Sequence, residues 1–301
     1  LMLGPQLHST TDNSLAKQLE NYHQFNWTLL LKHQEELSEI KTINLCYNWL
    51  CEPQEEMWVA PELCPSMGIW PALKEKLQLC KNLEKLNLSL NGLFQLSPSG
   101  WINIIKSAEQ WTKLKKLNLK GNTLSRLDDN GWEFIEALLI KCRNLDHLNL
   151  GNNALYELSP EKWHFIGNIL KNCDNLTRLK LGDNHLEKLD AKGWLNISNA
   201  LKKIPNLKRL NFSGNSMHFL EIGSWKELIK SLGKCKTLET VKFHKYHHSP
   251  TKNKLEKNER YTNIKLSPYR EEILKNHGFI PTEFTGTWQR KRGPRNSIYL
   301  V

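Results

Sequence analysis

One eleven-residue pattern recurs along the chain at a constant step and limits the folds that the chain can adopt. Its five clearest copies follow one another at intervals of 31 residues and begin at Leu83, Leu114, Leu145, Leu176 and Leu207. They read LEKLNLSLNGL, LKKLNLKGNTL, LDHLNLGNNAL, LTRLKLGDNHL and LKRLNFSGNSM. Fainter copies, IKTINLCYNWL and LETVKFHKYHH, begin at Ile40 and Leu238. A fixed step of this length indicates a solenoid, in which each repeat packs only on its neighbours.

The residues that follow each copy have the spacing of an amphipathic helix. A tryptophan opens each segment, and apolar residues follow at offsets of about 3, 7 and 10, as in Trp132, Ile135, Leu139 and Cys142. This spacing forms one stripe on a helix of 3.6 residues per turn. Residues suited to an N-cap precede four of these helices at Ser97, Asp128, Ser159 and Asp190. Each repeat is therefore predicted to contain a strand, a turn, a helix and a return.

Tryptophan and cysteine each recur at one point of the repeat. The tryptophans that open the helices are Trp27, Trp70, Trp101, Trp132, Trp163, Trp194 and Trp225. An aromatic platform for ligands is the functional alternative, but helical spacing favours burial of each indole between neighbouring helices. A second point carries Cys80, Cys142, Cys173 and Cys235, and in other copies Trp111 and Ile204. A position shared by these residue types is apolar, so buried free thiols are expected.

The total of seven cysteines is odd, which argues against a disulfide framework. Cysteines spread one per repeat also lack the close spacing of metal ligands, so no metal site is expected. A reducing compartment, most simply cytosol, follows from free thiols.

An asparagine recurs at position 9 of the pattern, where the chain leaves the predicted strand. The six copies are Asn48, Asn91, Asn122, Asn153, Asn184 and Asn215. A buried amide at this point can satisfy backbone groups of the neighbouring turn that would otherwise lack partners. Tyr246 replaces the asparagine in the last copy, so the solenoid is predicted to end there.

Register and composition divide the chain into three parts. Residues 1–26 are predicted to form a helical cap that covers the open end of the solenoid, with a helix from Ser14 to Gln24. Residues 27–248 form the repeat domain. Residues 249–301, which are rich in Lys and Arg, form a basic C-terminal cap and tail.

The C-terminal part contains one helix candidate, which begins at Pro268, continues to about Asn276 and stops before Gly278. The final stretch, TGTWQRKRGPRNSIYLV, is basic and is expected to be mobile. Nucleic-acid binding, a sorting signal and a merely solvated tail remain open for this stretch.

The repeat register breaks once, because Trp27 and Trp70 are 43 residues apart rather than 31. The excess lies in an insertion at residues 51–68. Insertions in solenoids form loops on one face, which is often the binding face. Met57 and Trp58 are apolar residues in this polar loop, so they either tuck back onto the protein or contact a partner.

The charge of the chain indicates the chemistry of its partner. There are 42 Lys and Arg against 31 Asp and Glu, a formal net charge of +11 with a pI near 9.2. Such a balance favours an acidic protein, nucleic acid or an anionic membrane. Positions 3, 5, 7 and 8 of the pattern should face outward from a parallel sheet. The candidates for partner binding at these positions are Tyr47, Lys85, Asn87, Lys116, Asn118, Lys120, His147, Asn149, Asn152, Arg178, Lys180, Asp183, Arg209, Asn211, Lys242 and His244.

Position 3 is the most informative of these, because it collects cations on adjacent strands. Strands stand about 4.8 Å apart, well within the Debye length of about 8 Å at physiological salt, so these cations repel one another. Acidic residues at position 2, such as Glu84 and Asp146, could compensate, but Lys115 and Lys208 occupy the same position and aggravate the repulsion. Folding gains nothing from this arrangement and an acidic partner would relieve it. The asparagines at position 5 offer uncharged donors and acceptors beside the cations.

Catalytic and membrane functions find little support. The chain has no G-x-S-x-G, P-loop or H-E-x-x-H motif, and the histidines His244, His247 and His248 are best explained as a surface cluster. We therefore expect a protein that is not an enzyme and needs no cofactor. No run of 18 apolar residues could span a bilayer. The first residues, LMLGPQLHST, have neither the basic nor the apolar region of a signal peptide, so none is expected.

The pattern L-x-x-L-x-L-x-x-N-x-L resembles the leucine-rich repeat, and the predicted fold is similar in architecture to ribonuclease inhibitor. The resemblance implies an α/β solenoid with a curved parallel sheet of about seven strands and helices on the convex side. The 31-residue step, the Gly-Trp before each helix and the Cys-x-Asn-Leu return (Cys80–Leu83, Cys142–Leu145, Cys173–Leu176) resemble leucine-rich repeat effectors of Legionella.

The effector resemblance implies export from the bacterial cytoplasm into a host cell through a type IV system. It also implies a monomer that acts by binding, with another effector or a host enzyme as partner. The sequence therefore predicts a non-catalytic module whose concave face binds an acidic protein and inhibits or regulates it. The alternative is a nucleic-acid-binding or scaffolding protein that uses the basic tail.

Overall fold

A computed structural model describes residues 14–20, 26–33, 35–48, 50, 69–243, 268–281 and 287–290. The predicted contact residues Met57, Trp58 and His244, and the side chain of Trp27, lie outside the described residues. None of the helices in these ranges has the length and apolarity that crossing a bilayer requires.

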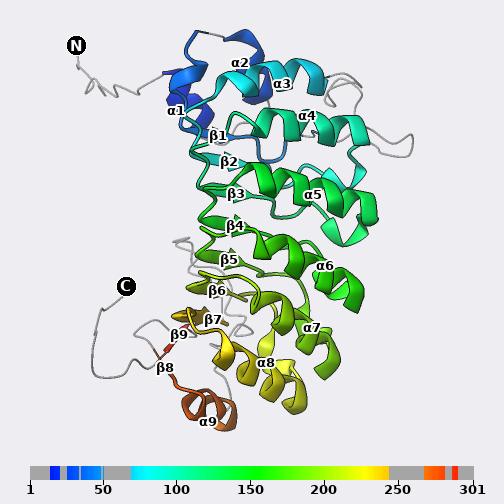
Figure 1. Cartoon of the computed structure of the whole chain (residues 1–301), viewed down its shortest axis with the longest axis vertical. Helices are drawn as coiled ribbons and strands as arrows, with labels where there is room; N and C mark the ends of the chain where they lie inside the picture. The colour runs from blue at the N-terminus through cyan, green and yellow to red at the C-terminus, as the bar shows by residue number, and fades with distance from the viewer. Residues whose placement is uncertain are drawn as a thin grey trace, which may run out of the picture.

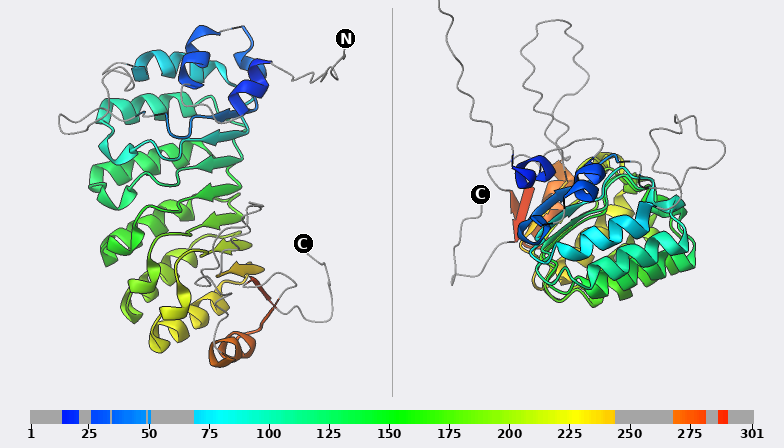
Figure 2. Two further views of the ribbon diagram at one scale, coloured as in Figure 1. Left: turned by 180° about the vertical axis from the view of Figure 1, so that it is seen from behind. Right: turned by 90° about the horizontal axis from the view of Figure 1, so that it is seen from above.

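Seven short parallel strands stack side by side along one side of the molecule, and helices line the other side (Figures 1 and 2). The strands are β1 (Thr42–Asn44), β2 (Lys85–Asn87), β3 (Lys116–Asn118), β4 (His147–Asn149), β5 (Arg178–Lys180), β6 (Arg209–Asn211) and β7 (Thr240–Lys242). The helices of the repeats are α3 (Ile69–Leu79), α4 (Pro98–Ala108), α5 (Asp129–Lys141), α6 (Pro160–Lys171), α7 (Ala191–Leu201) and α8 (Ile222–Lys234). This arrangement confirms the predicted α/β leucine-rich repeat solenoid.

A short 3-10 turn joins strand to helix in the repeats. These turns are η3 (Leu93–Gln95), η4 (Leu124–Arg126), η5 (Leu155–Glu157), η6 (Leu186–Lys188) and η7 (Met217–Phe219), whereas η1 (Leu37–Glu39) precedes β1. Helices α4 to α7 then start where the sequence predicts a cap. The Asp128 carboxylate accepts a hydrogen bond of 2.7 Å from the Gly131 N–H, and Asp190 does the same for Gly193 at 2.7 Å. Ser97 and Ser159 cap α4 and α6 in the same way.

The ladders of tryptophan and cysteine are buried as predicted. Every repeat tryptophan from Trp70 to Trp225 is at most 4% exposed, which excludes an exposed aromatic platform. The four repeat cysteines are buried free thiols. Burial raises the pKa of Cys80 and Cys142 to about 12, so both thiols stay protonated at neutral pH.

The position-9 asparagines form the buried ladder that the sequence predicts. The Asn122 carbonyl oxygen accepts from the N–H groups of Asn91 and Leu93, at 2.9 and 3.3 Å. Its amide nitrogen donates to the carbonyls of Leu88 and Leu119, at 2.9 and 3.0 Å. Asn153 and Asn184 repeat these contacts one step further along. Each amide therefore ties one turn to the next.

The backbone on either side of this asparagine is left-handed, a feature that residue type does not reveal. At position 8 the left-handed residues are Tyr47, Leu90, Gly121, Asn152, Asp183 and Gly214. At position 10 they are Gly92, Thr123, Ala154, His185 and Ser216. Glycine, Asn and Asp tolerate this conformation, whereas Leu and Ala pay for it in side-chain clashes.

Both ends of the sheet carry additional elements. Helix α1 (Leu15–Glu20) packs beside β1 through buried Leu15 and Leu19, and α2 (Asn26–Lys32) packs beside α3. Figure 1 shows both at the N-terminal end of the stack. Helix α9 (Pro268–Asn276) has the bounds that the sequence predicts, and Gly278 follows it with a φ of 81°.

The prediction of a mobile end starting at Thr285 was wrong for part of that segment. Strand β9 (Thr287–Arg290) pairs antiparallel with β7, and β8 (Phe279–Pro281) pairs with β9, so the sheet has nine strands in the order β1-β2-β3-β4-β5-β6-β7-β9-β8. Trp288 is 4% exposed and Phe279 is fully buried. The physical reason is that the last parallel strand would otherwise expose unpaired backbone groups along its edge.

Candidate protein-binding face

Strand register aligns two columns of side chains on the sheet face away from the helices, which we call the concave face. The position-3 column runs through Thr42, Lys85, Lys116, His147, Arg178, Arg209 and Thr240. The position-5 column runs through Asn44, Asn87, Asn118, Asn149, Lys180, Asn211 and Lys242. Neighbouring strands pair residue for residue, so the predicted alignment of the columns is confirmed.

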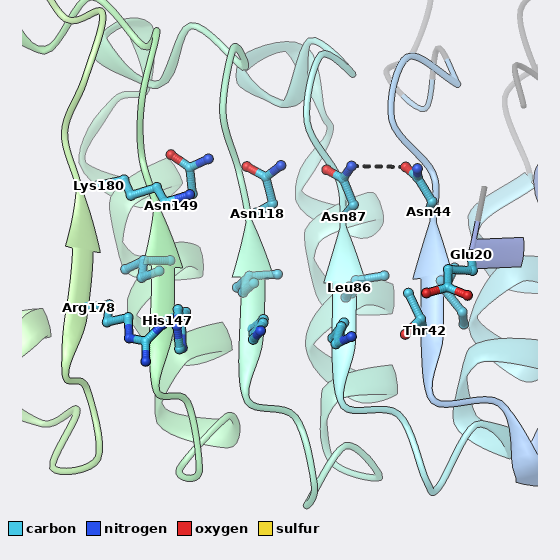
Figure 3. A pocket seen from close by; sticks show the side chains of 15 residues that line it. Glu20, Thr42, Asn44, Leu86, Asn87, Asn118, His147, Asn149, Arg178 and Lys180 are labelled. Carbon is cyan, nitrogen blue, oxygen red and sulfur yellow. Dashed lines mark hydrogen bonds between the residues drawn. The ribbon is translucent and has the colours of Figure 1, made fainter. Parts of the chain in front are cut away.

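A groove of about 570 Å³ crosses this face from β1 to β5. Eight predicted residues line it, namely Lys85, Asn87, Lys116, Asn118, His147, Asn149, Arg178 and Lys180 (Figure 3). The groove is also lined by Thr42, Asn44 and Glu20, and Glu20 is its one carboxylate among the described residues. Sequence reasoning missed Glu20, because a predicted helix at residues 14–24 carries no signal of where it packs.

The other predicted residues that the structure describes lie outside the groove. Arg209, Asn211 and Lys242 extend both columns onto β6 and β7. Tyr47, Lys120, Asn152 and Asp183 lie in the turns just after their strands.

The position-5 asparagines have a structural role that sequence reasoning did not assign. The carbonyl oxygen of each accepts a hydrogen bond from the backbone N–H two residues on, as Asn118 does from Lys120 at 3.1 Å and Asn149 does from Gly151 at 3.1 Å. These contacts are Asx turns that fix the chain as it leaves the strand. The acceptor is thus engaged, and the amide N–H groups of Asn118 and Asn149 are the part available to a partner.

One predicted cation is already neutralised within the protein. Lys120 Nζ lies 2.9 Å from a carboxylate oxygen of Asp183, across the intervening repeat. The two residues are 63 positions apart, which is about two repeats. This pair removes Lys120 from the set of cations that lack an acidic neighbour.

The acidic residues at position 2 do not neutralise the groove cations. Glu84 pairs with Lys115 at 3.2 Å, and Lys115 with Lys41 and Lys85 holds the pKa of Glu84 below its ordinary value. Asp146 accepts from the Thr177 hydroxyl and lies 2.7 Å from His147 Nδ1.

The cations of the groove itself form no such ion pairs. Among the described residues, no carboxylate forms an ion pair with Lys85, Lys116, Arg178 or Lys180. The groove therefore keeps its positive charge.

The pKa of His147 depends on burial and on the charged residues around it. Burial lowers the pKa of His147 below its ordinary value of 6.5, Asp146 opposes this shift, and Arg178, Lys116 and Lys180 lower the pKa further. The imidazole is therefore neutral at physiological pH, between charged neighbours on β3 and β5.

We expect His147 to make folding stability depend on pH. Its folded pKa lies below its unfolded value, so the unfolded chain binds more protons as the pH falls below about 6.5. The stability contribution is complete above that pH and is lost as the pH falls further. An NMR titration of the imidazole should give a midpoint below 6.5, and His218→Gln should leave that midpoint unchanged. A midpoint at or above 6.5 would contradict this view of the groove.

The described part of the chain contains no group of three or more His, Cys, Asp or Glu side chains arranged as metal ligands. Burial raises the pKa of Cys80 and Cys142 to about 12 and that of Cys173 to about 11, so these three cysteines stay as thiols.

Comparison with known proteins gives structural similarity only. No protein-family model and no curated protein sequence matches the chain. Among solved structures, the leucine-rich repeat-containing protein LegL7 from Legionella pneumophila is similar at 18% identity over 75% of this chain and 71% of that one, with a TM-score of 0.47. The tropomodulin C-terminal domain of Caenorhabditis elegans is similar at 16% identity over 56% of this chain and 93% of its own length, with a TM-score of 0.38. The repeat units themselves, each a strand, a 3-10 turn and a helix, identify this chain as a leucine-rich repeat solenoid.

Proposed function

We propose that this protein is a non-catalytic binding module whose concave face holds an acidic protein partner. The observation that carries the proposal is the set of groove cations Lys85, Lys116, Arg178 and Lys180, which lie on β2, β3 and β5 and form no ion pair with any carboxylate among the described residues. A partner carboxylate would gain attraction from several cations at once and would relieve their mutual repulsion. The amide groups of Asn118 and Asn149 would add uncharged donors beside them.

The absence of catalysis is part of the proposal. The sequence lacks the hydrolase, phosphate-binding and metalloprotease motifs. Binding alone can inhibit an enzyme when a broad face covers the mouth of its active site. We therefore propose occlusion of a partner enzyme as the mode of action, and a bacterial effector delivered to a host cell as its setting. The effector setting is supported by the 31-residue step and the Cys-x-Asn-Leu return.

A pair of charge reversals in the groove should abolish partner capture. Affinity purification from the native cell or from a host cell should recover an acidic protein with the wild-type chain. Lys116→Glu with Arg178→Glu should weaken that capture by at least about tenfold, because two attractive contacts become repulsive. Lys81→Glu with Lys192→Glu is the matched control, since it makes the same change of charge at exposed residues away from the groove.

Capture that survives reversal of Lys116 and Arg178 would contradict the proposal. The alternative, nucleic-acid binding through the basic tail, predicts another outcome. Affinity for any DNA or RNA would fall steeply with rising salt and would be retained by the groove variant.

A further inference from the structure

Two large apolar side chains stand exposed at a backbone position that disfavours them. Tyr47 is 40% exposed and Leu90 is 42% exposed. Both occupy position 8 of the repeat in the left-handed conformation, with φ angles of 55° and 58°. The four later repeats described at this position use residue types that tolerate it, namely Gly121, Asn152, Asp183 and Gly214.

Folding does not explain the choice of leucine at this point. A left-handed leucine costs roughly 1–2 kcal/mol relative to its right-handed form, and apolar surface left in water gains nothing in return. Leu90 does contact the next turn, because a Cβ placed on Gly121 would come within 2.5 Å of Leu90 Cδ2. Leu90 remains 42% exposed in spite of that contact. Strain retained at an exposed site is a recognised mark of function.

The two residues lie on adjacent turns, each three residues after an asparagine that lines the groove. The Tyr47 N–H donates to the Ser89 carbonyl at 2.9 Å, and the Leu90 N–H donates to the Lys120 carbonyl at 2.9 Å, so successive position-8 residues are on adjacent turns. Asn44 and Asn87, three residues earlier in each repeat, line the groove. Figure 3 shows both amides at the β1–β2 end, with Arg178 and Lys180 at the opposite end on β5. An apolar corner thus adjoins the N-terminal end of a cationic groove.

We infer that Tyr47 and Leu90 form an anchor site, continuous with the groove, for an acidic protein segment that carries a large apolar residue at one end of its acidic run. This inference rests on the proposed function and specifies the partner. The groove spans four strand spacings, roughly 19 Å, which an extended segment of about six residues covers. The apolar end supplies a contact that excludes water, and such contacts dominate the energy of many interfaces.

Synthetic peptides test the anchor directly. One probe is a fluorescent eight-residue peptide of Asp and Glu, and two others carry Leu-Trp at one end or the other. We expect one of the Leu-Trp peptides to bind the wild-type chain about tenfold more tightly than the plain peptide, since burial of one large apolar side chain supplies that factor. Fluorescence anisotropy at low salt measures all three.

The decisive variant is Leu90→Asn, because asparagine already occupies the same position at Asn152. It should lose most of the tenfold advantage of the Leu-Trp peptide, keep the affinity for the plain peptide and keep or raise the unfolding temperature. Phe219→Asn is the control, since Phe219 is 74% exposed on η7, beyond the strands that line the groove, and should keep the advantage. If Leu90→Asn folds poorly, Tyr47→Asn makes the same comparison.

The outcomes separate this inference from the proposed function. Equal affinity of the wild-type chain for all three peptides would overturn the anchor and leave the acidic groove standing. An advantage that survives both Leu90→Asn and Tyr47→Asn would also overturn it. No binding of any peptide would overturn both the anchor and the acidic partner.

Discussion

Replacing Asn122 with alanine is expected to lower the free energy of unfolding by about 4 kcal/mol, because three buried backbone groups lose their partner and each unsatisfied group costs about 1–3 kcal/mol, reduced by relaxation. The fourth group, the Leu119 carbonyl, still accepts from the Asn153 amide at 3.1 Å. The amide is fully buried and bonds to Asn91, Leu93, Leu88 and Leu119. The loss should be largest near the centre of the ladder, where a repeat has neighbours on both sides. Denaturant titration measures it.

The matched control is Asn118→Ala in the same repeat. Asn118 is half-buried and accepts a single hydrogen bond, from the Lys120 N–H at 3.1 Å, so its removal should cost about 1 kcal/mol. The same residue type thus has two different costs within five positions. Equal losses for the two variants would show that the buried ladder does not hold the turns together.

Replacing Arg270 with methionine is expected to destabilise the C-terminal end of the solenoid by about 3 kcal/mol. The Arg270 side chain is 8% exposed. Its guanidinium donates to the carbonyls of Met217, His218 and Leu220 and lies over the ring of Trp225 at 5.7 Å. Methionine keeps the apolar stem but removes every donor, and a hydrogen bond from a charged group contributes about 1.5–3 kcal/mol. The carbonyls of His218 and Leu220 at the end of η7 would then lose the donor that Arg270 supplies, while the Met217 carbonyl keeps the Leu220 N–H at 3.3 Å.

Hydrogen exchange locates this loss. Amides of β7 and β9 should exchange faster in Arg270→Met, while amides of β2 and β3 should keep their protection, since stability in a solenoid is local. Arg270→Lys should keep only part of the protection, because a lysine ammonium cannot donate to the three carbonyls in the geometry of the planar guanidinium. Lys275→Met, at an exposed position on the same helix, is the control. Uniform loss of protection along the chain would contradict a local cap.

The repeating parts of the structure could be predicted from the sequence because each side chain meets the same surroundings in every repeat. Trp132 and Asn122 are each one member of a series that recurs in every repeat. The constant step between five clear copies is enough to predict that every member of each series is buried. The two columns of the concave face follow from the same register. Their alignment needs only the step of 31 residues and a parallel sheet.

Contacts that occur once could not be predicted in this way. The pair of Lys120 and Asp183 bridges two repeats, and no periodic signal connects residues 63 positions apart. Arg270 donates to the Leu220 carbonyl at the end of η7, which lies 50 residues earlier in the chain. Strand β9 pairs with the edge of β7, which is also distant in sequence. Lys120 and Asp183 form a pair that other repeats do not copy, and Arg270 and β9 belong to a non-repeating segment whose packing the local sequence does not encode.

The left-handed conformation of the turns could not be predicted from the sequence for a different reason. Gly121 and Gly214 are of a residue type that favours that conformation. Leu90 and Ala154 are also left-handed, but Leu and Ala rarely adopt this conformation and so do not predict it. The neighbouring asparagine ladder imposes the backbone shape on whatever residue is present. A residue in a strained backbone conformation can therefore be recognised only from the structure.

We propose that the groove cations are arranged for a partner at a cost to the stability of the free protein. The most direct measurement is the unfolding temperature of Lys116→Glu with Arg178→Glu at low salt, alongside its affinity for the acidic peptides. We predict that the free variant is more stable than the wild type by about 1 kcal/mol, because repulsion becomes attraction, and that it binds at least about tenfold more weakly. Loss of stability, or binding that is unchanged, would contradict the account.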